Sequence, residues 1–225
     1  MTIFSHPDDE SLLVGGILAK AKEEGVDTTV VILSKGEKGS FKLKKGKKEL
    51  GKIREREFKR ACKALGVSKA VIFNFPDLAF VKVKKELQKR IKQLLREEKP
   101  QMVVTHDPSG GYGHPDHIVT SFLVKDVLSE LRKEGMKASL YFSVLEEGIR
   151  KKSQSPEEVG RFMPKPTIVV DTSLFTKKKA RACREYRSQV SEGKLVFFDQ
   201  IFSRVLKKEF LHKVDFRKKY AYPEI

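Results

Sequence analysis

Two short segments hold the residues of this 225-residue chain whose types and spacing are best suited to catalysis. The first box is Ser5-His6-Pro7-Asp8-Asp9-Glu10, and the second box is Gly113-His114-Pro115-Asp116-His117. A catalytic zinc ion typically takes three protein ligands, such as two histidines and a carboxylate, and keeps one position for water. A carboxylate that is not a ligand can accept a proton from the attacking water, and a histidine can protonate the departing nitrogen. The two boxes therefore predict metal-assisted hydrolysis.

The positions of the histidines support this prediction. Four of the five histidines lie just beyond an expected strand or at the start of an expected helix, namely His6, His106, His114 and His117. In open α/β sheets, ligands bind at the carboxyl ends of strands. A single His-Pro pair is usually a turn, and Asp-Asp before a helix is often only a cap. Because two such boxes occur together, we favour a metal site at the carboxyl ends of the strands.

The segments around the boxes alternate between short β-branched runs and longer amphipathic ones, a pattern typical of βα units. The expected strands are Thr2–Ser5, Thr28–Ser34, Ala70–Phe75, Met102–Thr105, Leu140–Val144 and Thr167–Val170. The expected helices are Glu10–Glu24, Glu49–Leu65, Val83–Glu98, Pro115–Lys133 and Lys177–Val190. We therefore expect an α/β fold with a mostly parallel sheet and right-handed crossovers between neighbouring parallel strands.

Three segments lack this alternation: Lys35–Lys48, Asp107–His114 and Glu146–Pro166. Long irregular segments are more often binding loops or lids than accidents. The sequence contains no internal repeat and no evident domain boundary, and 39% of its residues are hydrophobic. A chain of this length can bury a substantial core, so we expect one domain over residues 1–225.

The net charge of +17 is the unusual bulk property of the chain. Such a field attracts phosphates, nucleic acids, anionic lipids or acidic glycans. A lysine-rich surface can also serve solubility and form ion-pair networks with glutamates, and we prefer this explanation. No nucleic-acid motif and no interleaved aromatic residues accompany the charge, so we expect no specific nucleic-acid partner. A basic rim could instead steer an anionic substrate or a lipid head group toward the metal.

The sequence shows no membrane span or secretory signal. Its longest apolar stretch, Leu12–Ala19, is far shorter than the ~20 residues that cross a bilayer, and it follows acidic rather than basic residues. We therefore expect a cytoplasmic protein. In a reducing compartment Cys62 and Cys183 should be small core residues without a disulfide.

The two boxes resemble the signature of the PIG-L or LmbE-like deacetylases, which combine an early His-Pro-Asp-Asp-Glu box with a His-Pro-Asp-His box in mid-chain. Further stretches similar to the family are Lys35–Gly39, Ile53–Glu57, Leu65–Val67, Phe75–Leu78 and Arg187–Gln189. The resemblance covers nearly the whole chain and implies a Rossmann-like three-layer αβα sandwich. It also implies a hydrolase that uses one zinc ion (Zn²⁺) per chain to remove an N-acetyl group from a GlcNAc-type amino sugar or glycoconjugate.

The resemblance implies a role for individual residues. His6, Asp9 and His117 are implied as the metal ligands, and Asp8 as the general base that activates the attacking water. His114 is implied to stabilise the oxyanion and to protonate the leaving amine, with Asp116 as its orienting partner.

Two further residues, Arg54 and Asp77, are implied to hold sugar hydroxyls. For Arg54 a second interpretation is open, an ion pair on the helix surface with Glu55 or Glu57.

The chain departs from the family pattern at three places. It begins only five residues before His6, so the first strand should be short, and Ser5 replaces a more usual proline or small apolar residue. Glu146–Pro166 matches nothing in the family, which leaves the substrate open. An amidase acting on another N-acyl substrate and a non-catalytic, basic, polyanion-binding protein on the same scaffold are the alternatives, and a homo-oligomer is also left open.

Overall fold

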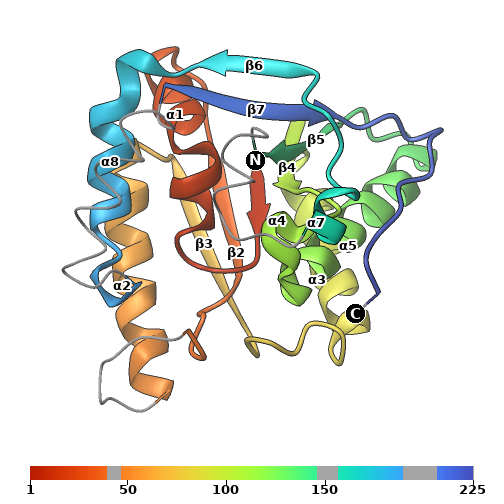
Figure 1. Cartoon of the computed structure of the whole chain (residues 1–225), viewed down its shortest axis with the longest axis horizontal. Helices are drawn as coiled ribbons and strands as arrows, with labels where there is room; N and C mark the ends of the chain where they lie inside the picture. Colours follow the sequence, from red (N-terminus) through yellow and green to blue (C-terminus); the bar gives the residue numbers. More distant parts are fainter. Residues whose placement is uncertain (40–46, 146–156, 190–206, 225) are drawn as a thin grey trace. The chain divides into compact units, whose positions relative to one another are not determined.

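The computed structural model describes residues 1–39, 47–145, 157–189 and 207–224 of the chain (Figure 1). These residues fall into two units. Unit 1 comprises Met1–Ser5, Leu78–Val169 and Phe210–Ile225, and unit 2 comprises His6–Asp77 and Val170–Glu209. The first box begins at the end of the first segment of unit 1, and the second box lies wholly in unit 1.

Unit 1 is built on strands that are mostly parallel. Its strands are β1 (Thr2–Phe4), β4 (Met102–His106), β5 (Ser139–Val144) and the part of β7 (Lys208–Lys213) that lies in this unit. β1 pairs with β4 and β4 with β5 in parallel, whereas β7 pairs with β5 antiparallel. The apolar residues Val103 and Val104 of β4 and Leu140, Phe142 and Val144 of β5 are buried, so these strands form the interior of the unit.

The helices of unit 1 are α3 (Lys84–Glu98), the short α4 (Gly110–Gly113), α5 (Pro115–Lys133) and α7 (Glu157–Gly160). α5 packs on β1, β4 and β5, and α3 packs on α5. Pro115 occupies the first turn of α5, where its missing N–H costs nothing. The second box therefore starts the helix that covers the parallel strands of this unit.

Unit 2 contains the parallel pair β2 (Thr29–Ser34) and β3 (Lys69–Phe75). Its helices are α1 (Asp9–Glu23), α2 (Lys47–Leu65) and α8 (Thr176–Arg184), with the short turns η1 (Ser173–Phe175) and η2 (Arg187–Gln189). α1, α2 and α8 pack on one another (Figure 1). β6 (Ile168–Asp171) spans the boundary between the units in the sequence.

Helix α1 is interrupted at Val14, and a buried ion pair stabilises the break. Val14 has a φ of −141° and a ψ of 20°, so the helix starts again after it and its new first amides need acceptors. The Glu209 carboxylate accepts the N–H groups of Gly16 and Ile17, each at 2.7 Å. Lys179 Nζ lies 2.7 Å from Glu209 Oε1, and both side chains are 2% exposed. Glu209 therefore caps the second part of α1 with a neutralised charge.

Replacing Glu209 by Ala should lower the free energy of unfolding by about 3–5 kcal/mol, because Lys179 would remain buried without a counterion. Two backbone N–H groups would also lose their acceptor. Chemical denaturation of the variant and the wild type measures the change. As a control, Glu24→Ala removes only the exposed ion pair with Lys20 and should have a far smaller effect. Equal stability of Glu209→Ala and the wild type would contradict this account.

The predicted α/β fold with a mostly parallel sheet is confirmed. The strand β7 was not predicted. The predicted helix Lys177–Val190 is wrong at its end, because α8 stops at Arg184 and the buried Glu57 carboxylate binds the amide and hydroxyl of Ser188. The expectation of one domain over residues 1–225 stays a prediction.

Other predictions concern the cysteines and the membrane. Cys62 and Cys183 are buried, free thiols, as expected. Within the described ranges, no helix is both long and apolar enough to cross a membrane. The predicted irregular segments Lys35–Lys48 and Glu146–Pro166 lie partly outside the described residues, which omit 40–46 and 146–156.

Candidate active site

The first box forms a tight turn in which Asp9 contacts His6. The His6 amide donates to Asp9 Oδ2 at 2.8 Å, and the Asp9 amide donates to the His6 carbonyl at 3.3 Å. The same Asp9 oxygen lies 3.8 Å from His6 Nδ1, and both residues are buried. An imidazole nitrogen and a carboxylate oxygen thus lie close together at the start of α1.

Asp77, which follows β3, holds the other nitrogen of His6. Its Oδ1 lies 3.0 Å from His6 Nε2, and its Oδ2 accepts the amide of Lys38 at 2.8 Å. Burial alone would raise the pKa of Asp77, but the hydrogen bond and charge of His6 lower it to about 2. When His6 loses one proton to become neutral, the ionised Asp77 favours the form in which Nε2–H donates a hydrogen bond to Asp77 and the Nδ1 lone pair lies on the side of Asp9.

Asp8 has an unusual backbone conformation, with a φ of 106°. Non-glycine residues seldom adopt positive φ, and such strain concentrates at functional sites. Its carboxylate is partly exposed, and Oδ2 lies 3.1 Å from Arg54 Nη2. Burial raises the pKa of Asp8 to about 7, against the opposing effect of the Arg54 guanidinium. A carboxyl group with a pKa near neutrality is suited to proton transfer.

Arg54 lies in the middle of α2 and is only 4% exposed. It donates to the carbonyls of Pro7 and Gly36 as well as to Asp8. Its contacts therefore join the first box to the turn after β2, rather than forming the helix-surface pair with Glu55 or Glu57. The prediction that Arg54 and Asp77 also hold sugar hydroxyls stays a prediction.

Glu10 is fully buried, and its carboxylate holds the strained backbone of Asp8. The amide of Asp8 donates to Glu10 Oε2 at 3.2 Å. The hydroxyls of Ser11 and Tyr186 both donate to Oε1 at 2.5 Å. Burial raises the pKa of Glu10 to about 7, although these donors act in the opposite direction. Glu10 is thus the link between the α8 end of unit 2 and the conformation of Asp8.

Replacing Tyr186 by Phe should lower the free energy of unfolding by about 1–3 kcal/mol, because the buried Glu10 carboxyl loses a hydrogen-bond donor. Thermal or chemical denaturation measures the change. Tyr141→Phe provides a matched control at a partly exposed tyrosine and should unfold like the wild type. A Tyr186→Phe variant as stable as this control would show that the hydroxyl contributes nothing.

The second box places His114 at the cap of α5. The amide of Asp116 donates to His114 Nδ1 at 3.2 Å, so the proton of a neutral His114 lies on Nε2. The Asp116 carboxylate is buried and accepts the amides of Leu78 at 2.7 Å and Phe80 at 3.2 Å. Asp116 therefore orients His114 through its backbone and fixes the turn that follows Asp77.

Three histidine rings of unit 1, those of His106, His114 and His117, are stacked. The rings of His106 and His117 lie 3.9 Å apart and nearly parallel, and those of His114 and His117 lie 4.5 Å apart. His117 Nδ1 lies 3.2 Å from the carbonyl of Gly110. A carbonyl can only accept, so Nδ1 carries the proton and Nε2 has a lone pair that can bind a metal ion. His106 Nε2 accepts the amide of Ser5 at 3.2 Å and supports the stack from β4.

Comparisons with known proteins place this site in a family. The family described as "PIG-L: GlcNAc-PI de-N-acetylase" matches residues 1–128. A 1D-myo-inositol 2-acetamido-2-deoxy-alpha-D-glucopyranoside deacetylase of Saccharomonospora viridis is 30% identical, over 85% of this chain and 85% of its own. A diacetylchitobiose deacetylase of Thermococcus kodakarensis is 31% identical, over 85% of this chain and 70% of its own.

The chain belongs to the PIG-L family. The fold agrees, because the structure of N,N'-diacetylchitobiose deacetylase from Pyrococcus horikoshii matches 99% of this chain and 85% of its own with a TM-score of 0.80 at 21% identity. The resemblance inferred from the two boxes is confirmed. Each box also contains a buried histidine and a buried carboxylate of the kind that could hold a metal ion.

The sequence did not predict that Tyr112 would lie beside the histidines of the second box. Tyr112 is 53% exposed, and its ring meets the rings of His114 and His117 edge to face at 5.8 and 5.7 Å. Gly113, with a φ of 90°, makes the turn that presents it. The sequence feature that could have indicated Tyr112 is its place as the single aromatic residue among the glycines of the segment Asp107–His114.

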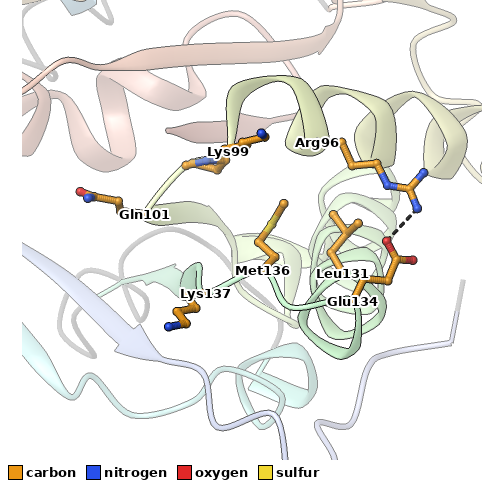
Figure 2. A pocket seen from close by; sticks show the side chains of 8 residues that line it. Arg96, Lys99, Gln101, Leu131, Glu134, Met136 and Lys137 are labelled. Atoms are coloured by element: carbon orange, nitrogen blue, oxygen red, sulfur yellow. Dashed lines mark hydrogen bonds and ion pairs between the residues drawn. The ribbon is translucent and has the colours of Figure 1, made fainter.

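A separate hollow of about 470 Å³ lies at the other end of the unit 1 strands (Figure 2). Its lining includes Gln101, just before β4, and Lys137, just before β5. The ion pair between Arg96 and Glu134, at 2.7 Å, crosses its rim. Ligands of open α/β sheets bind at the carboxyl ends of strands, so this hollow is not part of the candidate site.

Proposed function

We propose that this protein is a zinc-dependent N-deacetylase that hydrolyses the N-acetyl group of a GlcNAc-type amino sugar or glycoconjugate. The family supports the reaction class, and the names of two curated relatives support an acetamido sugar as the substrate. The observation that carries the proposal is that a neighbouring group engages one ring nitrogen of each of three histidines and so favours one position for its proton. Asp77, Gly110 and the Asp116 amide each engage one ring nitrogen of a histidine in the two boxes.

We propose that His6, Asp9 and His117 bind one zinc ion. Two histidines and a carboxylate form a recognised donor set for catalytic zinc. Asp9 Oδ2 and His6 Nδ1 are 3.8 Å apart, close enough for two ligands of one ion. Asp77 and the Gly110 carbonyl bind the opposite ring nitrogens, as expected for partners that orient metal-binding histidines. When bound, zinc would polarise the acetyl carbonyl and acidify the water.

We assign the proton transfers to Asp8 and His114. Asp8 accepts a proton from the water that attacks the acetyl carbon, and Arg54 keeps the Asp8 carboxylate in place. His114, with its proton on Nε2, donates a hydrogen bond to the developing oxyanion and then gives this proton to the departing nitrogen. The proton that Asp8 took from the water returns to the imidazole, so His114 ends the reaction neutral. The C–N bond breaks, water supplies the hydroxyl of the acid, and the products are acetate and a free amine.

Acetate release by the zinc-loaded protein tests the proposal. The panel contains free GlcNAc, diacetylchitobiose, GlcNAc-inositol, GlcNAc-malate, nucleotide-linked GlcNAc and a non-sugar N-acyl amide. Turnover of a sugar substrate supports the proposal, whereas turnover of the non-sugar amide alone would favour the alternative amidase. If the zinc-loaded protein releases acetate from no compound of the panel but binds polyanions, the result would favour the non-catalytic alternative. The cytoplasmic location and the homo-oligomer stay predictions.

A further inference from the structure

From Lys52 to the end of α2, every fully exposed residue of the helix is a cation. The exposed residues are Lys52, Arg56, Lys59, Arg60 and Lys63. Their spacing of three and four residues places them on one side of the helix. The opposite side, with Phe58, Ala61, Cys62 and Leu65, is buried. Apart from the exposed Glu49 in its first turn and the partly exposed Glu55, the helix therefore separates a core side from a basic side.

The end of unit 2 that contains α8 repeats this arrangement. The exposed residues of α8 and the following turn are Lys177, Lys178, Arg181, Arg184 and Arg187. Ala182 and Cys183 face the core. Leu174, in the short turn η1 just before α8, is 91% exposed and lies three residues before Lys177 in the sequence.

The two rows form one surface, because α2 and α8 lie side by side (Figure 1). Arg60 Nε contacts Glu185 Oε2 at 2.7 Å, and Glu57 binds Ser188, so the helices run in opposite directions. We call this surface the basic face, which consists of Lys52, Arg56, Lys59, Arg60, Lys63, Lys177, Lys178, Arg181, Arg184 and Arg187.

The basic face differs from the exposed surface of α3, where acidic and basic residues are mixed. On α3, exposed Glu86 and Glu97 alternate with lysines, and Lys92 and Arg96 pair with acids of α5 or its cap. On the basic face, acids pair with Lys59, Arg60 and Lys178. Within the described residues, no acid pairs with Lys52, Arg56, Lys63, Lys177, Arg181 or Arg187. Solubility alone would not require cations to be segregated in this way, and the segregation indicates an anionic partner.

The exposure of Leu174 indicates which kind of anionic partner the basic face binds. Within the described residues, the face has no fully exposed aromatic residue on which bases could stack, and Phe175 beside Lys178 is only partly exposed. A nearly fully exposed leucine beside lysines instead combines the two features with which peripheral helices bind anionic bilayers, an apolar residue for the interface and cations for the head groups. We propose that the basic face docks the protein reversibly on an anionic lipid surface, with Leu174 entering the head-group region.

Co-sedimentation with vesicles tests this proposal independently of catalysis. The wild type should bind vesicles of phosphatidylserine and phosphatidylcholine but not vesicles of phosphatidylcholine alone, and added salt should weaken the binding. The triple variant Arg56→Glu, Lys63→Glu and Arg181→Glu should bind at least about tenfold more weakly. The matched triple variant Lys85→Glu, Lys89→Glu and Lys133→Glu changes the net charge equally and should bind like the wild type.

Leu174→Asp provides a second test at an exposed position, where the fold is not at risk. It should weaken vesicle binding more than binding to duplex DNA, because the new carboxylate opposes both anionic partners whereas loss of the apolar side chain affects only the vesicle. Equal losses in the two triple variants would overturn the proposal in favour of a general effect of net charge. Tighter binding to duplex DNA than to anionic vesicles, with no larger effect of Leu174→Asp on vesicle binding, would identify a nucleic acid as the partner instead. Acetate release from a soluble substrate should be the same in all variants, so a failed deacetylase assignment would not affect this result.

Discussion

Replacing Asp8 by Asn should lower kcat by about 10²–10⁴-fold while the protein still binds zinc. Asn has the shape of Asp and can still contact Arg54 and occupy the same turn. It cannot accept the proton of the attacking water, which is the role that we assign to Asp8. The partly exposed Asp8 carboxylate is not among the ligands that we propose, so its loss should separate catalysis from metal binding. Steady-state acetate release and zinc content measure the two effects.

The control for this experiment is Asp27→Asn, which changes an exposed carboxylate of the same unit and should keep the wild-type rate. Retention of the wild-type rate by Asp8→Asn would contradict the assigned general base. Loss of zinc from Asp8→Asn would instead show that Asp8 is a ligand.

Replacing His117 by Ala should weaken zinc binding by more than about 100-fold and abolish turnover. Loss of an outer partner of a ligand already weakens metal binding 10–100-fold, and removal of a ligand should have a larger effect. The contact with the Gly110 carbonyl protonates Nδ1 and leaves the Nε2 lone pair as the donor. Zinc titration after treatment with a chelator measures the affinity, and readdition of zinc should restore activity to the wild type only.

His212→Ala is the matched control, because His212 contacts the carbonyl of Lys165 and the hydroxyl of Tyr220, away from both boxes. It should bind zinc like the wild type. The result that contradicts the assignment is normal zinc affinity in His117→Ala together with loss of zinc in His106→Ala. That pattern would make His106, which stacks on His117, the ligand.

The sequence predicted the elements whose patterns are local. The prediction of α5 is correct at both ends, because Pro115 favours its first turn and Gly135 follows its last. The prediction of α3 differs by one residue at its start, where Val83 is the cap. The family was also predictable, because the histidines and carboxylates of its two boxes are close in sequence and follow recognisable strands.

The sequence could not predict features that depend on distant partners. The interruption of α1 at Val14 depends on Glu209, which is almost two hundred residues away and begins an unpredicted strand. Arg54 occupies a position typical of an exposed ion pair, and only the fold brings it to Asp8. Asp8, with its positive φ, donates its amide to the buried carboxylate of Glu10. That carboxylate is held by the hydroxyl of Tyr186, a residue that lies in no motif.

The central claim is that the two boxes bind one zinc ion at a single hydrolytic centre. An anomalous difference map at the zinc edge, from crystals of the zinc-loaded protein, tests it most directly. The account predicts one strong peak per chain within about 2.0–2.2 Å of a nitrogen of His6, an oxygen of Asp9 and a nitrogen of His117. A strong peak that lacks any of these three residues as a ligand, or no peak in protein that releases acetate, would contradict it.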